Sequence, residues 1–289
     1  MPRKEIPIKL AQRQTIERIR RRAGHVLSSH AFVSLFLWQE QMGLRLCPLE
    51  DGYSVRCDAS AASGYFFPCG GEASVRAFVE GVLPGERLCY LRQQDAQYLQ
   101  REFPGRFEIS RRPQADEYLY DIQAHLALQG RAYANLRTQV RKVERDHCVR
   151  TEMIGAANAE DALRIIREWT HGERRFENCD LRDDEVDQTA VRMLDLLGMC
   201  GTLTYLDGEP MAVVAGFPLT RDTFDIVVAK CAENLQGLSY YSKRELMRRV
   251  SGRYGWINLE EDLGLAGLRR MKRSLQPSGM NQIWEAVRV

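Results

Sequence analysis

A repeated order of short elements constrains the fold of this chain more than any other feature. Residues 44–57 predict a β-hairpin, because Glu50-Asp51-Gly52 is a turn signal between two apolar runs. Residues 65–68 predict a third strand, which ends at Gly70-Gly71. Residues 72–82 then have the periodicity of a helix. The order is therefore hairpin, strand, glycine, helix.

The second half of the chain repeats this order. Residues 201–217 predict a hairpin around Asp207-Gly208, residues 223–229 a further strand, and residues 238–250 a helix that follows Gly237. The repetition supports two α+β domains in tandem, which we place at residues 1–115 and 116–289. A single sheet with added elements is the alternative. At the N-terminus, residues 15–22 and the apolar positions of 32–38 predict one continuous helix.

Composition excludes several classes of protein. The chain has 289 residues and 44% hydrophobic content, enough for a proper core. Its 41 Lys and Arg residues against 39 Asp and Glu residues leave a net charge of +2, so binding of a polyanion must come from local clusters. The longest apolar run, residues 31–38, is too short to cross a bilayer, and no signal peptide precedes it.

The cysteines and histidines do not form ligand patterns. Eight cysteines are scattered singly without a Cys-x-x-Cys pair, which is typical of reduced thiols in a cytoplasmic protein. The five histidines do not combine with them at metal-ligand spacing. We therefore expect no metal site and a cytoplasmic location.

The turn before the helix of residues 238–250 is a candidate anion site. A helix that starts after a strand presents free N–H groups to an anion. The turn contains Asn234, Gly237 and Ser239. It resembles in degenerate form the Gln/Arg-x-x-Gly-x-Gly/Ala turn that holds the pyrophosphate of coenzyme A in GNAT acyltransferases. A plain strand-to-helix turn is the alternative. Tyr240 and Tyr241, which follow, are candidates for the acceptor site.

A basic helix is predicted between the two repeats, at residues 130–145. Its apolar stripe is accompanied by five bases, Arg131, Arg137, Arg141, Lys142 and Arg145, and phosphate binding by this basic cluster is one hypothesis. A solvated charged face is the alternative interpretation.

The segment from Trp256 to Pro277 combines acids and bases. Residues 254–259 predict a strand, Glu260-Glu261-Asp262 lie at its exit, and a helix ending before Pro277 carries Arg269 and Lys272. Acids before a helix and bases late in it suit the helix dipole, which accounts for the order of charges without any function. It does not account for acids directly at the end of a strand.

Four blocks of this sequence resemble a known family. They are Phe32–Trp38, residues 65–70, residues 116–120 and, most specifically, residues 258–275, Asn-Leu-Glu-Glu-Asp-Leu-Gly-Leu-Ala-Gly-Leu-Arg-Arg-Met-Lys-Arg-Ser-Leu. The chain resembles the phosphatidylglycerol lysyltransferase C-terminal-domain-like proteins. This resemblance implies two GNAT-like (acyl-CoA N-acyltransferase-like) mixed-sheet domains in tandem, related to Fem-type transferases. It also implies a bacterial enzyme whose first domain is mainly structural and whose second carries the site.

The resemblance implies a transferase that moves an aminoacyl group from aminoacyl-tRNA, or an acyl group from acyl-CoA, to an amine or hydroxyl acceptor. The acceptor is a small molecule, a peptide or a lipid headgroup, and no cofactor is tightly bound. The positions that match family motifs are Arg137, Arg141, Asn258, Glu260, Asp262, Arg269 and Lys272.

Roles for these residues follow from the chemistry of acyl transfer, which requires a donor to the oxyanion and a route for the acceptor's proton. We predict Lys230, or a backbone N–H near it, as the donor and Glu260 or Glu261 as the proton acceptor. Asn234, Gly237, Ser239, Arg137, Arg141, Arg269 and Lys272 are predicted to bind the donor substrate. Tyr240, Tyr241, Asn258 and Asp262 are predicted for the acceptor. The rival hypothesis is a non-catalytic protein that binds a nucleic acid or a partner through the basic helix.

Overall fold

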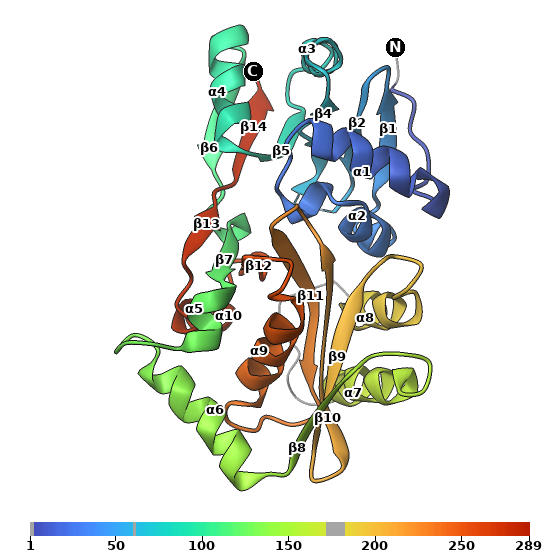
Figure 1. Ribbon diagram of the computed structural model, residues 1–289. Helices are drawn as coiled ribbons and strands as arrows, with labels where there is room; N and C mark the ends of the chain where they lie inside the picture. Colours follow the sequence, from blue (N-terminus) through green and yellow to red (C-terminus); the bar gives the residue numbers. More distant parts are fainter. Residues whose placement is uncertain (1–2, 60–61, 172–182) are drawn as a thin grey trace. The chain divides into compact units, whose positions relative to one another are not determined.

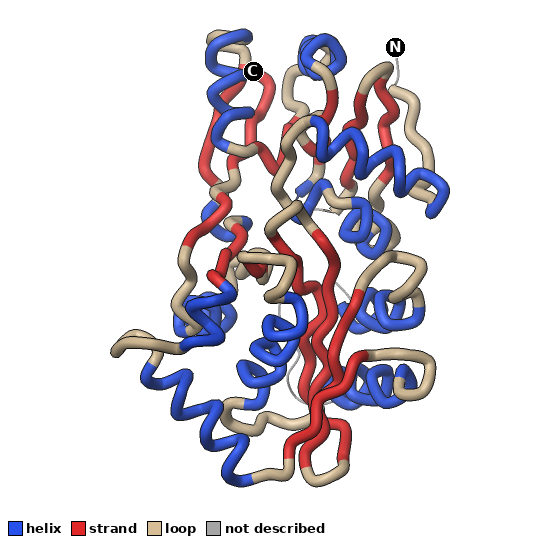
Figure 2. The backbone as a smooth tube through the Cα atoms, in the orientation of Figure 1, coloured by secondary structure: helices blue, strands red, loops and turns tan. Residues whose placement is uncertain are grey.

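The computed structural model describes residues 3–59, 62–171 and 183–289 (Figure 1). The chain divides into two compact units. The first consists of Met1–Glu117, Glu261–Gly264 and Asn281–Val289, and the second of Tyr118–Glu260 and Leu265–Met280. Each unit has one sheet that mixes parallel and antiparallel strands, with helices beside it (Figure 2). The predicted α+β class with two mixed sheets is confirmed.

The first sheet has the strand order β1-β2-β3-β5-β14-β6, and β4 pairs with β2 outside this path. Its strands are β1 (Arg45–Leu49), β2 (Gly52–Cys57), β3 (Gly64–Phe66), β4 (Cys69–Gly70), β5 (Arg87–Leu91), β6 (Phe107–Arg111) and β14 (Trp284–Arg288). The helices of this unit are α1 (Arg13–Arg22), α2 (Phe32–Trp38), α3 (Glu72–Glu80) and α4 (Gln93–Glu102). Short 3-10 turns lie at Leu10–Gln12, Ser28–His30 and Pro113–Ala115. Buried apolar side chains of α3, α4, β5 and β14 form its core.

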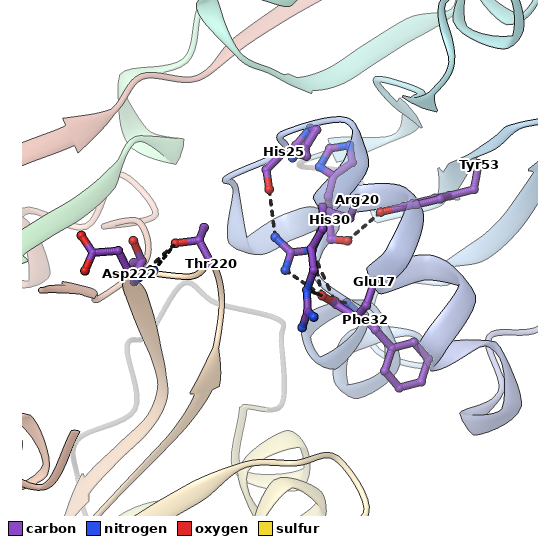
Figure 3. A network of polar contacts seen from close by, with 10 residues as sticks. Glu17, Arg20, His25, His30, Phe32, Tyr53, Thr220 and Asp222 are labelled. Atoms are coloured by element: carbon purple, nitrogen blue, oxygen red, sulfur yellow. Dashed lines mark hydrogen bonds and ion pairs between the residues drawn. The ribbon is translucent and has the colours of Figure 1, made fainter. Parts of the chain in front are cut away.

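The prediction of one helix over residues 15–38 is wrong, because α1 and α2 are separate helices. Gly24 has a φ of +57°, a left-handed conformation that ends a helix. The backbone N–H of Phe32, at the start of α2, donates to Oε1 of Glu17 on α1 at 2.9 Å. Figure 3 shows Arg20 between Glu17 and the carbonyl of His25. The guanidinium of Arg20 is 1% exposed and fixes the chain between the two helices.

The second sheet has the strand order β13-β7-β12-β11-β10-β9-β8. Its strands are β7 (Glu117–Asp121), β8 (Val149–Met153), β9 (Cys200–Leu206), β10 (Glu209–Pro218), β11 (Thr223–Cys231), β12 (Trp256–Asn258) and β13 (Gly279–Asn281). Its helices are α5 (Ile122–Ala127), α6 (Ala134–Asp146), α7 (Ala159–His171), α8 (Asp183–Arg192), α9 (Leu238–Val250) and α10 (Ala266–Ser274). Helices α7 and α8 lie on one side of β9–β11 and α9 lies on the other (Figure 1).

Both predicted hairpins are confirmed. β1 pairs antiparallel with β2, and β9 pairs antiparallel with β10. Asp207 and Gly208, in the second hairpin, have φ values of +55° and +93°, the left-handed pair that a two-residue hairpin turn requires. The strand predicted at residues 254–259 is shorter, Trp256–Asn258.

The two sheets share one pattern of strand pairing. Along β1-β2-β3-β5 the pairs are antiparallel, antiparallel and parallel, and along β9-β10-β11-β12 they are the same. The next strand is antiparallel in both sheets: β14 beside β5, and β7 beside β12. β7, which follows the other strands of the first half, thus belongs to the second sheet, and β14, which follows those of the second half, belongs to the first sheet. The two halves exchange equivalent strands.

This exchange corrects the predicted division at residues 115 and 116, which assigned the C-terminus to the second domain. Trp284–Arg288 instead pair with β5 on one edge and with β6 on the other. The position is favourable because both edges of β14 then find hydrogen-bond partners.

Candidate functional site

Strands β11 and β12 separate at the point where the candidate site begins. They pair in parallel at three positions, ending with Asp225 beside Asn258. β11 continues along β10 as far as Cys231, whereas the chain after β12 stays with β7. There the N–H of Leu259 donates to the carbonyl of Tyr118 at 3.0 Å, and the N–H of Tyr118 donates to the carbonyl of Glu260 at 3.1 Å. The end of β11 is therefore left without β12 as a neighbour.

Glu260 lies in this diverging segment in a strained conformation. Its φ is +57°, which is uncommon for a residue with a side chain. The N–H of Glu260 donates to Oδ1 of Asn258 at 2.8 Å, and Asn258 is fully buried. Asn258 therefore holds the backbone turn at Glu260.

Lys243 is a buried cation in the second turn of α9. It is 5% exposed, and its Nζ donates to Oγ of Ser239 at 2.7 Å and to the Ser239 carbonyl at 3.1 Å. Among the described residues no carboxylate pairs with it. Burial, together with repulsion from Lys272 and Lys230, lowers the pKa of Lys243 to about 8 against the opposing effect of Cys231. A buried ammonium with neutral partners favours an anion nearby.

Two further lysines act on Lys243 electrostatically. Lys272 of α10 is 6% exposed, and its Nζ donates to the carbonyl of Leu259 at 2.6 Å. Lys230 lies near the end of β11, where its Nζ is 2.6 Å from Oδ2 of Asp183 and 3.3 Å from Oδ2 of Asp187. Lys230 and Lys272 are candidates from the sequence, whereas Lys243, on which both act electrostatically, is not.

The predicted glycine turn has a packing explanation. Gly237 has a φ of +92° and is the N-cap of α9. A Cβ at this position would lie 2.8 Å from the carbonyl oxygen of Gln139 on α6. The glycine therefore lets α9 start against α6 and is not by itself evidence for a coenzyme A site. Asn234 and Ser239 are both exposed, although Ser239 also contacts Lys243.

The two predicted acceptor tyrosines point into the core. Tyr240 is 3% exposed, and its hydroxyl lies 3.0 Å from Nδ1 of the buried His125. Tyr241 is 7% exposed. Both belong to the apolar core of the second unit, so their contacts are structural.

The basic helix α6 is confirmed, and its two candidate arginines differ. Arg137 is partly buried, and its Nη1 donates to the carbonyls of Leu128 and Gly130, the latter at 2.7 Å. Arg137 therefore stabilises the loop that follows α5. Arg141 is exposed, as are Arg131 and Arg145.

The remaining candidates in the block of residues 258–275 are divided between the two units. Glu260 belongs to the second unit, whereas Glu261 and Asp262 belong to the first. Asp262 is 1% exposed, and its Oδ1 accepts the N–H of Gly264 at 2.9 Å. Arg269 of α10 is half-buried.

Lys243 carried a signal that the sequence interpretation missed. Tyr240, Lys243, Met247 and Val250 are spaced three, four and three residues apart, and all four are buried. This spacing is that of an apolar helical stripe. A lysine inside such a stripe is buried, and a buried lysine requires an explanation.

Two negative findings concern the part of the chain that the structure describes. No group of three or more His, Cys, Asp or Glu residues there is arranged to hold a metal ion. Likewise, none of its helices combines the length and the apolar character needed to cross a bilayer.

Solved structures with the same fold include proteins of three kinds. A conserved protein of unknown function from Bacteroides thetaiotaomicron VPI-5482 has a TM-score of 0.88 at 21% identity, with 100% of both chains covered. L-PGS from Bacillus licheniformis has a TM-score of 0.63 at 16% identity, covering 95% of this chain and 91% of that one. FemX has a TM-score of 0.63 at 7% identity, covering 99% and 97%. At these identities the likeness establishes the fold alone. A search of curated proteins gave no match.

The family follows from the sequence itself. Residues 20–284 match the model of the family described as "Phosphatidylglycerol lysyltransferase, C-terminal". The chain belongs to this family of transferases, and the predicted resemblance is confirmed.

Proposed function

We propose that this protein transfers an aminoacyl group from aminoacyl-tRNA to an amine or hydroxyl acceptor, and that Lys243 stabilises the transition state. The observation that carries the proposal is the burial of Lys243, among the described residues, without a paired carboxylate. Its helix α9 packs on β11, whose end extends beyond the pairing with β12. Family membership supports the reaction class. The acceptor is a small molecule, a peptide or a lipid headgroup.

The chemistry places a negative charge where this lysine lies. Attack of the acceptor on the ester carbonyl forms a tetrahedral oxyanion, and a fixed ammonium in a desolvated site stabilises it. Both oxygens of Ser239 orient Nζ of Lys243. At neutral pH a lysine with a pKa of about 8 is mostly protonated, as this role requires. The carbon–oxygen bond to the tRNA ribose then breaks, and the ribose oxygen takes up a proton.

The acceptor must lose a proton as it attacks. Glu260 is the predicted carboxylate that belongs to the same unit as Lys243. It follows Leu259, whose carbonyl accepts from Lys272, and Lys272 acts electrostatically on Lys243. The position of Glu260 directly after Leu259, whose carbonyl binds Lys272, supports it as the base. The two carboxylates beside Lys230 make Lys243 the better donor to the oxyanion.

Aminoacyl-tRNA is favoured over acyl-CoA as donor by two observations. The glycine of the turn is accounted for by packing against Gln139, so the turn does not call for a pyrophosphate. Helix α6, which packs on α9, exposes Arg131, Arg141 and Arg145. Exposed arginines supply the salt-dependent part of affinity for a nucleic acid.

The test compares binding and turnover. Aminoacyl-tRNA, uncharged tRNA and acetyl-CoA are titrated at low salt, and single-turnover loss of the aminoacyl group is then followed with and without a panel of amine acceptors. Lys243→Met should slow this step by about 10² or more, since removal of one oxyanion donor has that effect. Arg249→Gln is the control: it also removes one positive charge from α9, but at an exposed position, and it should leave the rate unchanged. Binding of neither donor, or equal rates for Lys243→Met and wild type, would contradict the proposal.

A further inference from the structure

Both sheets contain a bulge at the same position, on the strand that lies between a parallel neighbour and the exchanged antiparallel strand. In the first sheet β5 has one residue more than β14 between two pairs of the ladder, and Tyr90 in this bulge has a φ of +53°. In the second sheet Leu259 and Glu260 both bond to Tyr118, which is again one residue more, and Glu260 has a φ of +57°. Tyr90 and Glu260 are therefore equivalent positions, and so are the residues before them, Cys89 and Leu259.

The carbonyl before the bulge has a different partner in each sheet. In the first sheet the N–H of Phe67, directly after β3, donates to the carbonyl of Cys89 at 2.9 Å, so the parallel neighbour continues its pairing. In the second sheet β11 pairs with β12 only as far as Asn258. There Nζ of Lys272 donates to the carbonyl of Leu259 at 2.6 Å. A side chain of α10 thus takes the place of the strand's donor, because a buried carbonyl requires a partner.

Lys272 lies in the apolar stripe of α10. Leu265, Leu268, Lys272 and Leu275 are spaced three, four and three residues apart, the spacing of a buried helical stripe. The lysine is 6% exposed, and burial of an ammonium is unfavourable unless it binds a polar group. The hydroxyl of Tyr120 donates to the carbonyl of Lys272 at 2.9 Å and fixes the end of α10. The helix therefore holds this ammonium beside the end of β12.

One peptide group connects Lys272 to the proposed base. The carbonyl of Leu259 accepts from Lys272. The N–H of Glu260, at the other end of the same peptide group, donates to Oδ1 of the buried Asn258 at 2.8 Å. Side chains thus bind both polar ends of this group. They fix the left-handed φ of Glu260, which is unfavourable for a residue with a side chain, and with it the direction in which the carboxylate leaves the backbone.

We propose that Lys272 is a positioning residue for Glu260: its ammonium replaces the donor of the missing strand and fixes the peptide group that directs the carboxylate of the base. This inference rests on the proposed function, in which Glu260 takes the proton of the acceptor. It gives Lys272 a role other than the predicted binding of the donor substrate, because its Nζ binds the backbone of the chain itself.

The first experiment needs no substrate. Lys272→Met keeps the apolar stem without the ammonium, and the amides of Tyr118 and Glu260 should then exchange hydrogen roughly tenfold faster or more, since a hydrogen bond to a charged donor contributes that much. The amides of β9 and β10 should keep their rates. Arg273→Gln, which removes a charge from an exposed position of α10, is the control and should change none of them. Unchanged exchange at Tyr118 and Glu260 in Lys272→Met would overturn the proposal.

A second pair of variants keeps Lys272 and covers the case in which Lys272→Met does not fold. If Lys272 and Asn258 hold the turn, residue 260 must adopt a left-handed φ whatever its side chain, and glycine adopts it without strain. Glu260→Gly should therefore melt at a higher temperature than Glu260→Ala, although both lack the carboxylate. Equal melting temperatures would show that the turn relaxes when its side chain changes, and would overturn the proposal.

The last experiment tests positioning in the reaction. Lys272→Met should slow single-turnover aminoacyl transfer by about 10²-fold, the effect of a small displacement of a reacting group, and should leave the Kd of aminoacyl-tRNA unchanged. In a Glu260→Gln background the same change should have little further effect, because Lys272 acts through Glu260. A full further loss in that background, or weaker binding of aminoacyl-tRNA, would overturn the proposal. If wild type uses no aminoacyl-tRNA, the proposed function fails instead, and hydrogen exchange still decides whether Lys272 holds the turn.

Discussion

The two units use the same strand pairing but differ at the helix that follows the third strand. In the first unit β3 has three residues and pairs with β5 at Tyr65 and Phe66, and the buried residues of α3 are Phe78 and Val79. In the second unit β11 has nine residues and extends beyond its pairing with β12. It is followed by α9, which carries the buried Lys243. The repeated framework is therefore scaffold, and the longer strand and the buried cation distinguish the unit in which we place the chemistry.

The largest expected effect concerns the exchanged strands. Deletion of Trp284–Val289 removes the strand between β5 and β6, so the first unit should lose on the order of 5 kcal/mol or more, the stability of a small domain. Hydrogen exchange should show loss of protection in β5 and β6 and retention in β9, β10 and β11. A chain shortened by Val289 alone is the control. Continued protection of β5 and β6 would show that the first unit does not need the returning strand.

The next effect concerns the lysine that distinguishes α9 from α3. The pKa of Lys243 is about 8 in the folded state against a usual value of 10.5, so between these values the unfolded state binds more protons. Stability should therefore rise with pH across this window, by about 3 kcal/mol relative to Lys243→Met. Denaturant unfolding of both proteins at pH 7 and pH 10.5 measures the difference. If the difference in unfolding free energy between the two proteins is the same at both pH values, Lys243 is solvated and the account of its burial is wrong.

The first unit should instead respond to acid. Burial, together with repulsion from Arg92 and Arg20, lowers the pKa of His30 to about 3 against the opposing effect of the bond to the Phe67 carbonyl. Because the unfolded value is 6.5, stability should fall as the pH drops below that value, by about 2 kcal/mol at pH 5. His30→Gln should weaken this dependence in denaturant unfolding between pH 7 and pH 5. An equal acid response in the variant would assign the effect to other groups.

The smallest effect compares the two glycines that precede these helices. Gly237→Ala should cost about 1 to 2 kcal/mol, because φ is +92° and the new Cβ would meet a backbone carbonyl at 2.8 Å. Gly71→Ala should cost less, because its φ is −69° and its Cβ would meet the end of the Asp51 side chain, which can turn away. Thermal unfolding of the two variants should rank them in this order. The reverse order would contradict the packing explanation of Gly237.

The sequence predicted the second hairpin and the helix α9 correctly, because their signals are local. Asp207-Gly208 marked a hairpin, and the apolar spacing of residues 238–250 marked α9. The exchange of β7 and β14 could not be predicted in this way, since pairing partners distant in sequence leave no local pattern. The two N-terminal helices were merged because the long-range contact from Glu17 to Phe32 is also absent from periodicity.

The candidate site remains a prediction. Lys230 and Lys272 are candidates because of their positions near a strand end and in the block of residues 258–275, and both act electrostatically on Lys243. The carboxylates that hold Lys230 lie on a helix more than forty residues earlier in the chain, so only the fold reveals them. Tyr240 was chosen for its place after the turn, but its hydroxyl contacts the buried His125.

The pH dependence of single-turnover aminoacyl transfer tests the central claim, that Lys243 acts as an ammonium ion in the second unit. The rate should fall as the pH rises through about 8, where Lys243 loses its proton. Lys243→Arg, which stays charged, should move this descending limb to higher pH. A limb that Lys243→Arg leaves unchanged, or a rate that rises through pH 8, would contradict the account.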